Sequence, residues 1–490
     1  MICQAMEISH RYQTIISLAL LLGMGLVTAV SFGLGIAVFL TACFILICFR
    51  WPLYSFCFVV IAAFLHNINI VYYSPLRIVS ERYSLGAIPV FILAGVVLIK
   101  IVVASKDDFI DHAVGKTILS KLKPHDYLII LFLIWSATTI FWSMDLYHGL
   151  NSIYNLLIGC CLYFLALYFL DDSRGIEFFF KIIFFGGVFL MGIFIVSNNF
   201  DPINYSHHLF GDFFFETGLI IYGKRPGGFA PPQIAGNIMV FIFFIGCVLF
   251  VKAKPAIRGI IVALGFFFCS SILASGSKAA SGSFLISILF FIVIYKPLRK
   301  KIIWIIPAAL FMFIGVLVFN TLILGSDRMT GGNDMNNLSL TLRLEFWNAG
   351  FDMLRQQIMG AGIGGFAKIV DPWPGAHSFY FGILFDVGLI GCLILFMYFL
   401  FLIFQLYYLR DGEIDNSLFL YLQCMLAFWV AFFVHAMVDL AYSLPYIWLL
   451  LGVFSALIKI IGSSATPICQ CALRGNSLEN VSHIEIAYHH

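Results

Sequence analysis

The stretch Gly375–Gly391 reads GAHSFYFGILFDVGLIG, and it closes the one long polar interval of the chain. That interval begins at Leu324, and apolar runs flank it on both sides. Long connections without regular secondary structure are uncommon in compact folds and are usually functional. We therefore expect a polar loop that covers a site at one face of a membrane, with His377 at the point where the chain re-enters the bilayer.

Composition indicates that most of the chain lies in a membrane. Of the 490 residues, 62% are hydrophobic and 11% are charged, and the mean hydropathy is +1.01. Soluble domains are about 45–50% apolar and about 25% charged. The net charge is only +3 and the charges are scattered along the chain, so no nucleic-acid partner is expected.

Apolar windows of about 17–25 residues predict the membrane helices. They define an all-α polytopic membrane protein with about 12–14 transmembrane helices and one long periplasmic loop that is partly helical. The predicted spans are residues 14–30, 32–49, 53–72, 86–104, 127–143, 150–170, 176–197, 233–251, 257–274, 280–295, 302–323, 378–408, 417–438 and 445–461.

Basic residues orient these helices, because Lys and Arg are enriched in cytoplasmic loops. Arg50, Arg174, Lys252 and Arg410 fall on one side by parity. That side is expected to be cytoplasmic, with both termini inside. The chain then divides into a helix bundle (1–323), a periplasmic loop covering the active site (324–377), C-terminal transmembrane helices (378–461) and a cytoplasmic tail (462–490).

Some basic residues break this pattern and lie on the outer side. A cation beside an outer helix end is a candidate for anion binding, although a single one is more often solvated or paired with a carboxylate. The exceptions are Arg77, Arg82, Lys224, Arg225, Lys278, Arg328, Arg343, Arg355 and Lys368.

The first candidate binding segment, Tyr222–Gly236, reads YGKRPGGFAPPQIAG. Its prolines stop a helix early and its glycines permit unusual backbone angles. Backbone amides and the guanidinium of Arg225 can therefore converge on an oxyanion, with Lys224 beside them. A guanidinium suits phosphate because its planar donors form two parallel hydrogen bonds. A simple turn carrying interfacial cations is the alternative.

The second candidate segment, residues 274–283, reads ASGSKAASGS and connects two predicted spans. Small residues let helices approach closely, so packing alone could explain most of this segment. Packing does not explain Lys278. A second cation at the level of Arg225 would suit a diphosphate, whose charge one guanidinium does not neutralise alone.

The third segment lies in the long loop. Residues 340–353 predict a helix with Leu344, Trp347 and Phe351 along one side and Arg343 near its start. The following Gly360–Phe366 reads GAGIGGF. No strand precedes it, so we assign these glycines to backbone turning and not to nucleotide binding.

His377 and Asp386 complete the candidate set. A histidine at a helix start, below a polar loop and near cations, is a candidate general base, because neighbouring positive charge keeps its imidazole neutral. Asp386 falls in apolar surroundings, where an ionisable group costs about 2.5–3.5 kcal/mol and needs a partner. The sequence has no Asp-x-Asp, His-Glu-x-x-His or Cys-x-x-Cys spacing, and Cys469-x-Cys471 alone is weak evidence for a metal, so neither a metal nor a cofactor is expected.

In this order the motifs resemble those of the O-antigen ligase and O-antigen polymerase superfamily, which comprises bacterial inner-membrane glycosyltransferases. The pattern His377-Ser378, nine residues, Gly388, two residues, Gly391 is similar to a signature of the ligases. The pattern Arg225, ten residues, Gly236 is similar to a spacing in the polymerases. The two patterns favour different branches of the superfamily, and the choice between ligase and polymerase stays open.

The resemblance implies a donor glycan carried on undecaprenyl diphosphate and an acceptor that is either lipid A-core or a growing glycan, with both substrates in contact with membrane lipids. Arg225, Lys278 and Arg343 would bind the diphosphate, although the superfamily commonly has Arg where this chain has Lys278. Lys224 and Asp386 would support the site.

The catalytic role falls to His377 in this resemblance. Its imidazole would deprotonate an acceptor hydroxyl for an inverting attack that needs no metal. Two other classes of protein compete with this reading. A polysaccharide or lipid flippase would show broken helices and ionisable residues at mid-membrane, whereas a non-catalytic scaffold would tolerate changes at His377 and Arg225.

Overall fold

The structure is a computed structural model that describes most of the chain. The described residues are 32–64, 68–73, 80–84, 87–106, 122–199, 205–210, 213–217, 232–275, 277–295, 297, 333–370, 375–409 and 416–464. The predicted spans 14–30 and 302–323 therefore lie outside the described residues.

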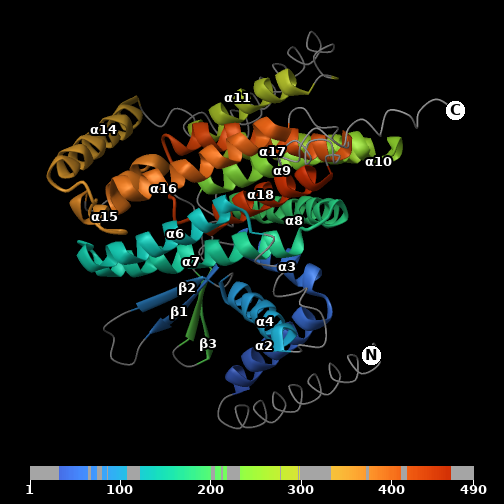
Figure 1. Cartoon of the computed structure of the whole chain (residues 1–490), viewed down its shortest axis with the longest axis horizontal. Helices are drawn as coiled ribbons and strands as arrows, with labels where there is room; N and C mark the ends of the chain where they lie inside the picture. Colours follow the sequence, from blue (N-terminus) through green and yellow to red (C-terminus); the bar gives the residue numbers. More distant parts are fainter. Residues whose placement is uncertain are drawn as a thin grey trace, which may run out of the picture.

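Helices dominate the described residues (Figure 1). Eight of them are long and apolar enough to cross a membrane, and four shorter apolar helices accompany them. The helices are α2 (Phe32–Arg50), α3 (Pro52–Phe64), α4 (Ala87–Lys106), α6 (Pro124–Thr138), the 3-10 turn η1 (Thr139–Trp142), α7 (Leu146–Phe169), α8 (Ser173–Asn199), α9 (Pro232–Lys252), α10 (Pro255–Ala274), α11 (Lys278–Ile294), α14 (Asn333–Gln356), α15 (Phe366–Ile369), α16 (Phe379–Leu409), α17 (Asn416–Ala436) and α18 (Pro445–Ser464).

The predicted class, an all-α polytopic membrane protein, is confirmed, with one correction to a span. The prediction for residues 53–72 is wrong at its C-terminal end, because α3 stops at Phe64 and strand β1 (Ile68–Tyr73) follows. That strand belongs to a small antiparallel sheet of order β2-β1-β4-β3, in which the other strands are β2 (Ser80–Ser84), β3 (Tyr205–Phe210) and β4 (Phe213–Thr217). The sheet joins the α3–α4 connection to the α8–α9 connection.

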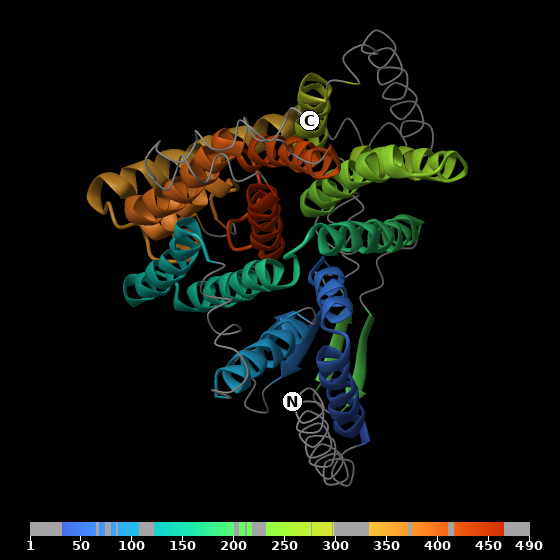
Figure 2. The same ribbon diagram turned by 45° about the vertical axis from the view of Figure 1, so that its right-hand side comes forward.

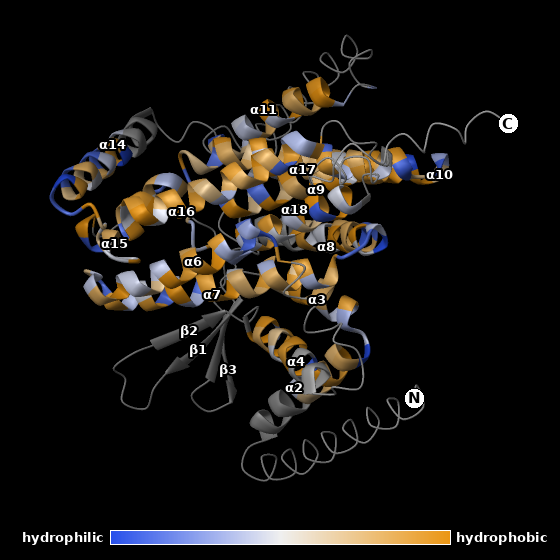
Figure 3. Cartoon of the chain, in the orientation of Figure 1, coloured by the Kyte–Doolittle hydropathy of each residue, from blue (hydrophilic) through white to orange (hydrophobic). Residues whose placement is uncertain are grey.

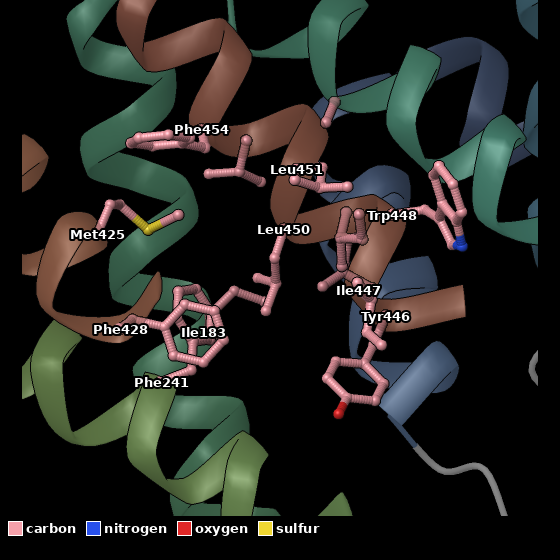
Figure 4. Close-up of a cluster of buried hydrophobic side chains, with 14 of the residues drawn as sticks. Ile183, Phe241, Met425, Phe428, Tyr446, Ile447, Trp448, Leu450, Leu451 and Phe454 are labelled. Atoms are coloured by element: carbon pink, nitrogen blue, oxygen red, sulfur yellow. The ribbon is translucent and has the colours of Figure 1, made fainter. Parts of the chain in front are cut away.

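Helix α18 lies at the centre of the bundle, as the red helix in Figure 2 shows. Of the apolar stretch of α18 that is long enough to cross a membrane, 83% is buried inside the protein. Figure 4 shows Leu450 of α18 facing Ile183, Phe241 and Phe428, which come from α8, α9 and α17. Side chains from separate spans therefore interdigitate around α18, as van der Waals packing in a membrane requires.

One end of the bundle is held by a buried ion pair. The ammonium of Lys459 in α18 lies 2.6 Å from Oδ2 of Asp126 in α6, and Asp126 is fully buried. Oδ1 of the same carboxylate accepts a hydrogen bond from the hydroxyl of Tyr163 in α7. The start of α6 and the end of α18 were predicted to share the cytoplasmic side, and this contact places them at the same end of the bundle.

Replacing Lys459 with methionine is expected to lower the free energy of unfolding by about 3–5 kcal/mol, because the buried Asp126 loses its counter-charge. The melting temperature of the purified protein in detergent measures this effect. Lys181→Met is the matched control, since Lys181 pairs with Glu177 at an exposed site where an ion pair contributes about 0–1 kcal/mol. Equal melting temperatures for the two variants would contradict the prediction.

Candidate functional site

Helix α14 covers the beginning of α16 (Figure 1). Phe346 of α14 and Phe385 of α16 are buried in one hydrophobic cluster. The indole Nε1 of Trp347 donates a hydrogen bond of 3.0 Å to the backbone oxygen of Ala376, directly before His377. Leu344, on the side that the sequence predicts to be apolar, is 48% exposed, whereas Phe346 is buried.

The glycine-rich segment 360–366 turns the backbone, as expected, and fits between α16 and the α6–α7 connection. The amide of Met144 donates to the carbonyl of Ala361 at 3.1 Å. The amide of Ile363 donates to Oγ1 of Thr139 at 2.9 Å, and Oγ of Ser143 donates to the carbonyl of Ile363 at 2.9 Å. Backbone groups of the segment are therefore satisfied by protein neighbours.

Asp386 has the partners that its buried position requires. The amide of Phe366 donates to Oδ1 at 3.0 Å, and the hydroxyl of Tyr442 donates to Oδ2 at 3.0 Å. Tyr442 lies in the α17–α18 connection, so one carboxylate ties together the glycine-rich segment, α16 and that connection. Asp386 thus has a structural role in holding these three segments together.

Helix α16 is interrupted at Gly388, the first glycine of the ligase-like pattern. Gly388 has φ 72° and ψ −171°, which break the helical path. The next amide, that of Leu389, donates to the carbonyl of Ile358 at 3.2 Å instead of continuing the helix. The indole of Trp135 donates to the carbonyl of Val387 at 2.8 Å. The backbone of residues 358 and 359 therefore occupies the break.

His377 stands immediately before α16 with a positive φ of 49°. The hydroxyl of the following Ser378 donates to the carbonyl of Ala436 at 3.3 Å, which ties the start of α16 to the end of α17. The ring of Phe346 lies 6.5 Å from the imidazole and nearly parallel to it. The histidine is thus fixed between the covering helix α14 and the end of α17.

Burial is the main cause that lowers the pKa of His377 below its ordinary value of 6.5. The carboxylate of Asp439 acts in the opposite direction and raises this pKa, while the guanidinium of Arg343 lowers it. Two groups of opposite charge therefore act on one imidazole. The net result favours the neutral ring, which is the form that accepts a proton.

Asp439 is the residue that the sequence analysis missed. It follows α17, and its backbone amide donates to the carbonyl of His435 at 3.1 Å. The only available signal was a carboxylate in a short outer connection between two predicted spans. Nothing in that signal indicates His377, which lies far away along the chain.

Lys278 is the first residue of α11, and its side chain is exposed. The preceding Ser277 caps the helix, since its Oγ accepts a hydrogen bond of 3.2 Å from the amide of Ala280. A Cβ atom built on Gly236, near the start of α9, would lie only 2.8 Å from Cβ of Ala280. The candidate segment around Lys278 therefore packs against the first turn of α9.

Helix α9 connects this segment to the end of α17. The amide nitrogen Nδ2 of Asn237 lies 3.3 Å from Nδ1 of His435, and the hydroxyl of Tyr446 donates to Oδ1 of Asn237 at 3.4 Å. Through these contacts Lys278 lies at the same end of the bundle as His377, and Arg343 acts electrostatically on His377. Lys224 and Arg225, which precede α9, lie outside the described residues.

Within the part of the chain that the structure describes, no group of three or more His, Cys, Asp or Glu side chains could hold a metal ion. The candidate functional groups there are the cations of Lys278 and Arg343, the imidazole of His377 and the carboxylate of Asp439. Such a set can bind an anion and move one proton.

The fold and this site define a multi-pass membrane protein with a polar site at one end of its helix bundle. A family model described as O-antigen ligase matches residues 260–396, a range that contains Lys278, Arg343, His377 and Asp386. This match confirms that the segment is similar to the O-antigen ligase family, as its motifs indicate. The comparison with curated proteins finds no match.

Proposed function

We propose that the protein is a metal-independent inverting glycosyltransferase that moves a glycan from undecaprenyl diphosphate to a sugar hydroxyl. We assign it to the O-antigen ligases, which attach polysaccharide to lipid A-core. The observation that carries the proposal is the imidazole of His377, which Arg343 and burial favour in its neutral form. In this proposal the site faces the periplasm, and both termini lie on the cytoplasmic side of the inner membrane.

The proposed reaction needs one base and several cations. His377 accepts the proton of the acceptor hydroxyl while the hydroxyl oxygen forms a bond to the anomeric carbon. The bond from that carbon to the diphosphate oxygen breaks on the opposite face, and both electrons leave with the diphosphate. Asp439 stabilises the imidazolium that forms, because its carboxylate favours the charged ring.

The leaving diphosphate is assigned to Arg225, Lys278 and Arg343. Cations placed where negative charge develops stabilise the transition state more than the ground state. Because the diphosphate departs as a stable anion, protonation of the leaving group is not needed. Membrane lipids surround the polyprenyl tail of the donor in this arrangement.

A deletion strain distinguishes the ligase from the polymerase. We expect lipid A-core without any repeat units, together with accumulated lipid-linked polymer. A single repeat on the core, with no ladder of longer glycans, would instead assign the protein to the polymerase branch. A complete ladder in the deletion strain would contradict both assignments.

A flippase is the second candidate, because α16 is a broken helix and transporters use such helices at their binding sites. The break in this protein argues against that role. A Cβ atom built on Gly388 would lie 2.7 Å from the carbonyl oxygen of Ile358, so loop backbone fills the position that a substrate would need. Transfer by the purified protein with donor and acceptor on the same side of the membrane would exclude transport as its activity.

Replacing Arg343 with glutamine is expected to move the acid limb of the pH–activity profile to higher pH. Arg343 lowers the pKa of His377, so its removal raises that pKa and leaves more imidazole protonated at a given acidic pH. Initial transfer rates across a pH series measure the shift. Arg355→Gln is the matched control on the same helix, because Arg355 is exposed and pairs with Asp352. Equal profiles for both variants would contradict the prediction.

Replacing Lys278 with arginine is expected to preserve transfer, whereas Lys278→Ala is expected to raise the KM for the lipid-linked donor. Both cations can bind a diphosphate, and the exposed position at the start of α11 leaves room for the larger guanidinium. Lys368→Ala is the control, since Lys368 is an exposed lysine elsewhere in the covering loop. An inactive Lys278→Arg variant, or an unchanged KM in Lys278→Ala, would remove Lys278 from the diphosphate site.

A further inference from the structure

Helix α14 carries exposed apolar side chains along one edge. Leu344 is 48% exposed and Phe351 is 41% exposed. Seven residues correspond to two helical turns, so these side chains share one side of α14. Ile358 follows at the same interval, just beyond the helix end, and is 61% exposed. Together Leu344, Phe351 and Ile358 form what we term the apolar edge.

Polar residues occupy the neighbouring exposed side of α14. Asn348 and Asp352 are exposed there, one turn apart from each other. Figure 3 shows hydrophilic and hydrophobic residues interleaved along the coloured part of α14, in contrast to the mostly hydrophobic α16. The helix thus has a buried face against α16, a polar outer face and the apolar edge between them, which is the pattern of a helix at a membrane interface.

The apolar edge continues directly into the surface of a membrane span. The carbonyl of Ile358 accepts a hydrogen bond from the amide of Leu389, which lies just after the break in α16. From that point α16 exposes Leu389 at 41%, Leu393 at 52% and Phe396 at 61%. These side chains lie on one side of a helix long and apolar enough to cross a membrane, where lipid is the expected neighbour.

We propose that the apolar edge of α14 inserts between the acyl chains of the adjacent bilayer leaflet, so that α14 is an interfacial helix anchored in lipid. Continuity with the exposed surface of α16 identifies the occupant, since both surfaces meet at Ile358. An interfacial helix typically buries its apolar side by about 5–10 Å in the headgroup and acyl boundary. The proposal does not depend on which reaction the site performs.

Fluorescence quenching of the full-length protein tests this proposal. An environment-sensitive fluorescent amino acid is placed at position 344 or 358, with positions 348 and 352 as matched controls on the polar side. Each variant is incorporated as one copy per nanodisc of phosphatidylethanolamine and phosphatidylglycerol. We expect lipids brominated along their acyl chains to reduce emission at 344 and 358 and to leave emission at 348 and 352 unchanged.

Iodide in the water phase provides the complementary measurement. We expect iodide to reduce emission at positions 348 and 352 and to leave 344 and 358 unchanged. Equal iodide quenching at all four positions would overturn the proposal, because the edge would then face water. Protection at 344 and 358 from both quenchers would overturn it as well, because a protein surface would then cover the edge. A melting temperature equal to that of the unlabelled protein confirms that each variant is folded.

Discussion

Replacing His377 with glutamine is expected to reduce glycan transfer by about 10²–10⁴-fold, which is the usual contribution of a positioned general base. Glutamine retains a polar side chain of similar reach but cannot accept the proton of the acceptor hydroxyl. The cations that bind the donor remain, so the affinity for lipid-linked donor should not change. Transfer by purified protein in nanodiscs, together with a donor-binding titration, measures both quantities.

Asp439→Asn is the companion variant for this prediction. Asp439 raises the pKa of His377, so its neutralisation should move the acid limb of the pH–activity profile to lower pH. This shift is opposite in sign to that of Arg343→Gln, and a purely structural defect would not produce opposite shifts. Wild-type transfer by His377→Gln would assign the proton transfer to another group and would refute the proposed mechanism.

Hydropathy predicts the membrane helices well because lipid imposes a simple rule. A spanning segment needs about 20 predominantly apolar residues and satisfies its own backbone hydrogen bonds. The prediction 233–251 therefore corresponds closely to α9, which runs from Pro232 to Lys252. The sheet escaped prediction because a short apolar run such as Ile68–Tyr73 can form a strand or continue a helix, and periodicity alone does not separate the two.

The residue types of the candidate site can be predicted from the sequence, but their partners cannot. The sequence predicts His377 as a base and Arg343 as a cation, and in the structure the charge of Arg343 lowers the pKa of His377. The acidic neighbour Asp439 and the partner of Asp386 both come from residues near the end of α17. Such contacts depend on how distant spans pack, and a single sequence does not encode that packing as a local pattern.

The sequence of α14 does not by itself decide which side of the helix is buried. The helical spacing of Leu344, Trp347 and Phe351 predicts that they share one side of the helix. In the structure Phe346 is buried and Leu344 is exposed. An aromatic residue stands on either face of this helix, so hydrophobic periodicity does not decide which face the rest of the protein covers.

Replacing Gly388 with alanine is expected to reduce transfer by about 10²-fold, although residue 388 itself takes no part in the chemistry. Its φ of 72° costs a non-glycine residue about 1–3 kcal/mol. The added Cβ would also lie 2.5 Å from the carbonyl oxygen of Met359. Backbone cannot rotate away as a flexible side chain does, so either α16 or the covering loop must move.

A displacement at Gly388 would be transmitted to the site through contacts of its neighbours in the loop and in α16. Gly360, with its own φ of 79°, packs against the backbone of Asp386 and Gly388, and Asp386 accepts a hydrogen bond from Tyr442 in the α17–α18 connection. A displacement of about 1 Å at a catalytic group can cost about 10²-fold in rate. The melting temperature should fall as well, because the loop residues no longer pack correctly against the break in α16.

Gly282→Ala is the matched control for Gly388→Ala. Gly282 lies in α11, and a Cβ atom there would meet nothing within 4 Å. Alanine favours a helix over glycine by about 1 kcal/mol, so this variant should keep full transfer and an equal or higher melting temperature. Transfer and stability at wild-type levels in Gly388→Ala would mean that the break in α16 is not needed to seat the loop. The ligase-like glycine would then require a different physical explanation.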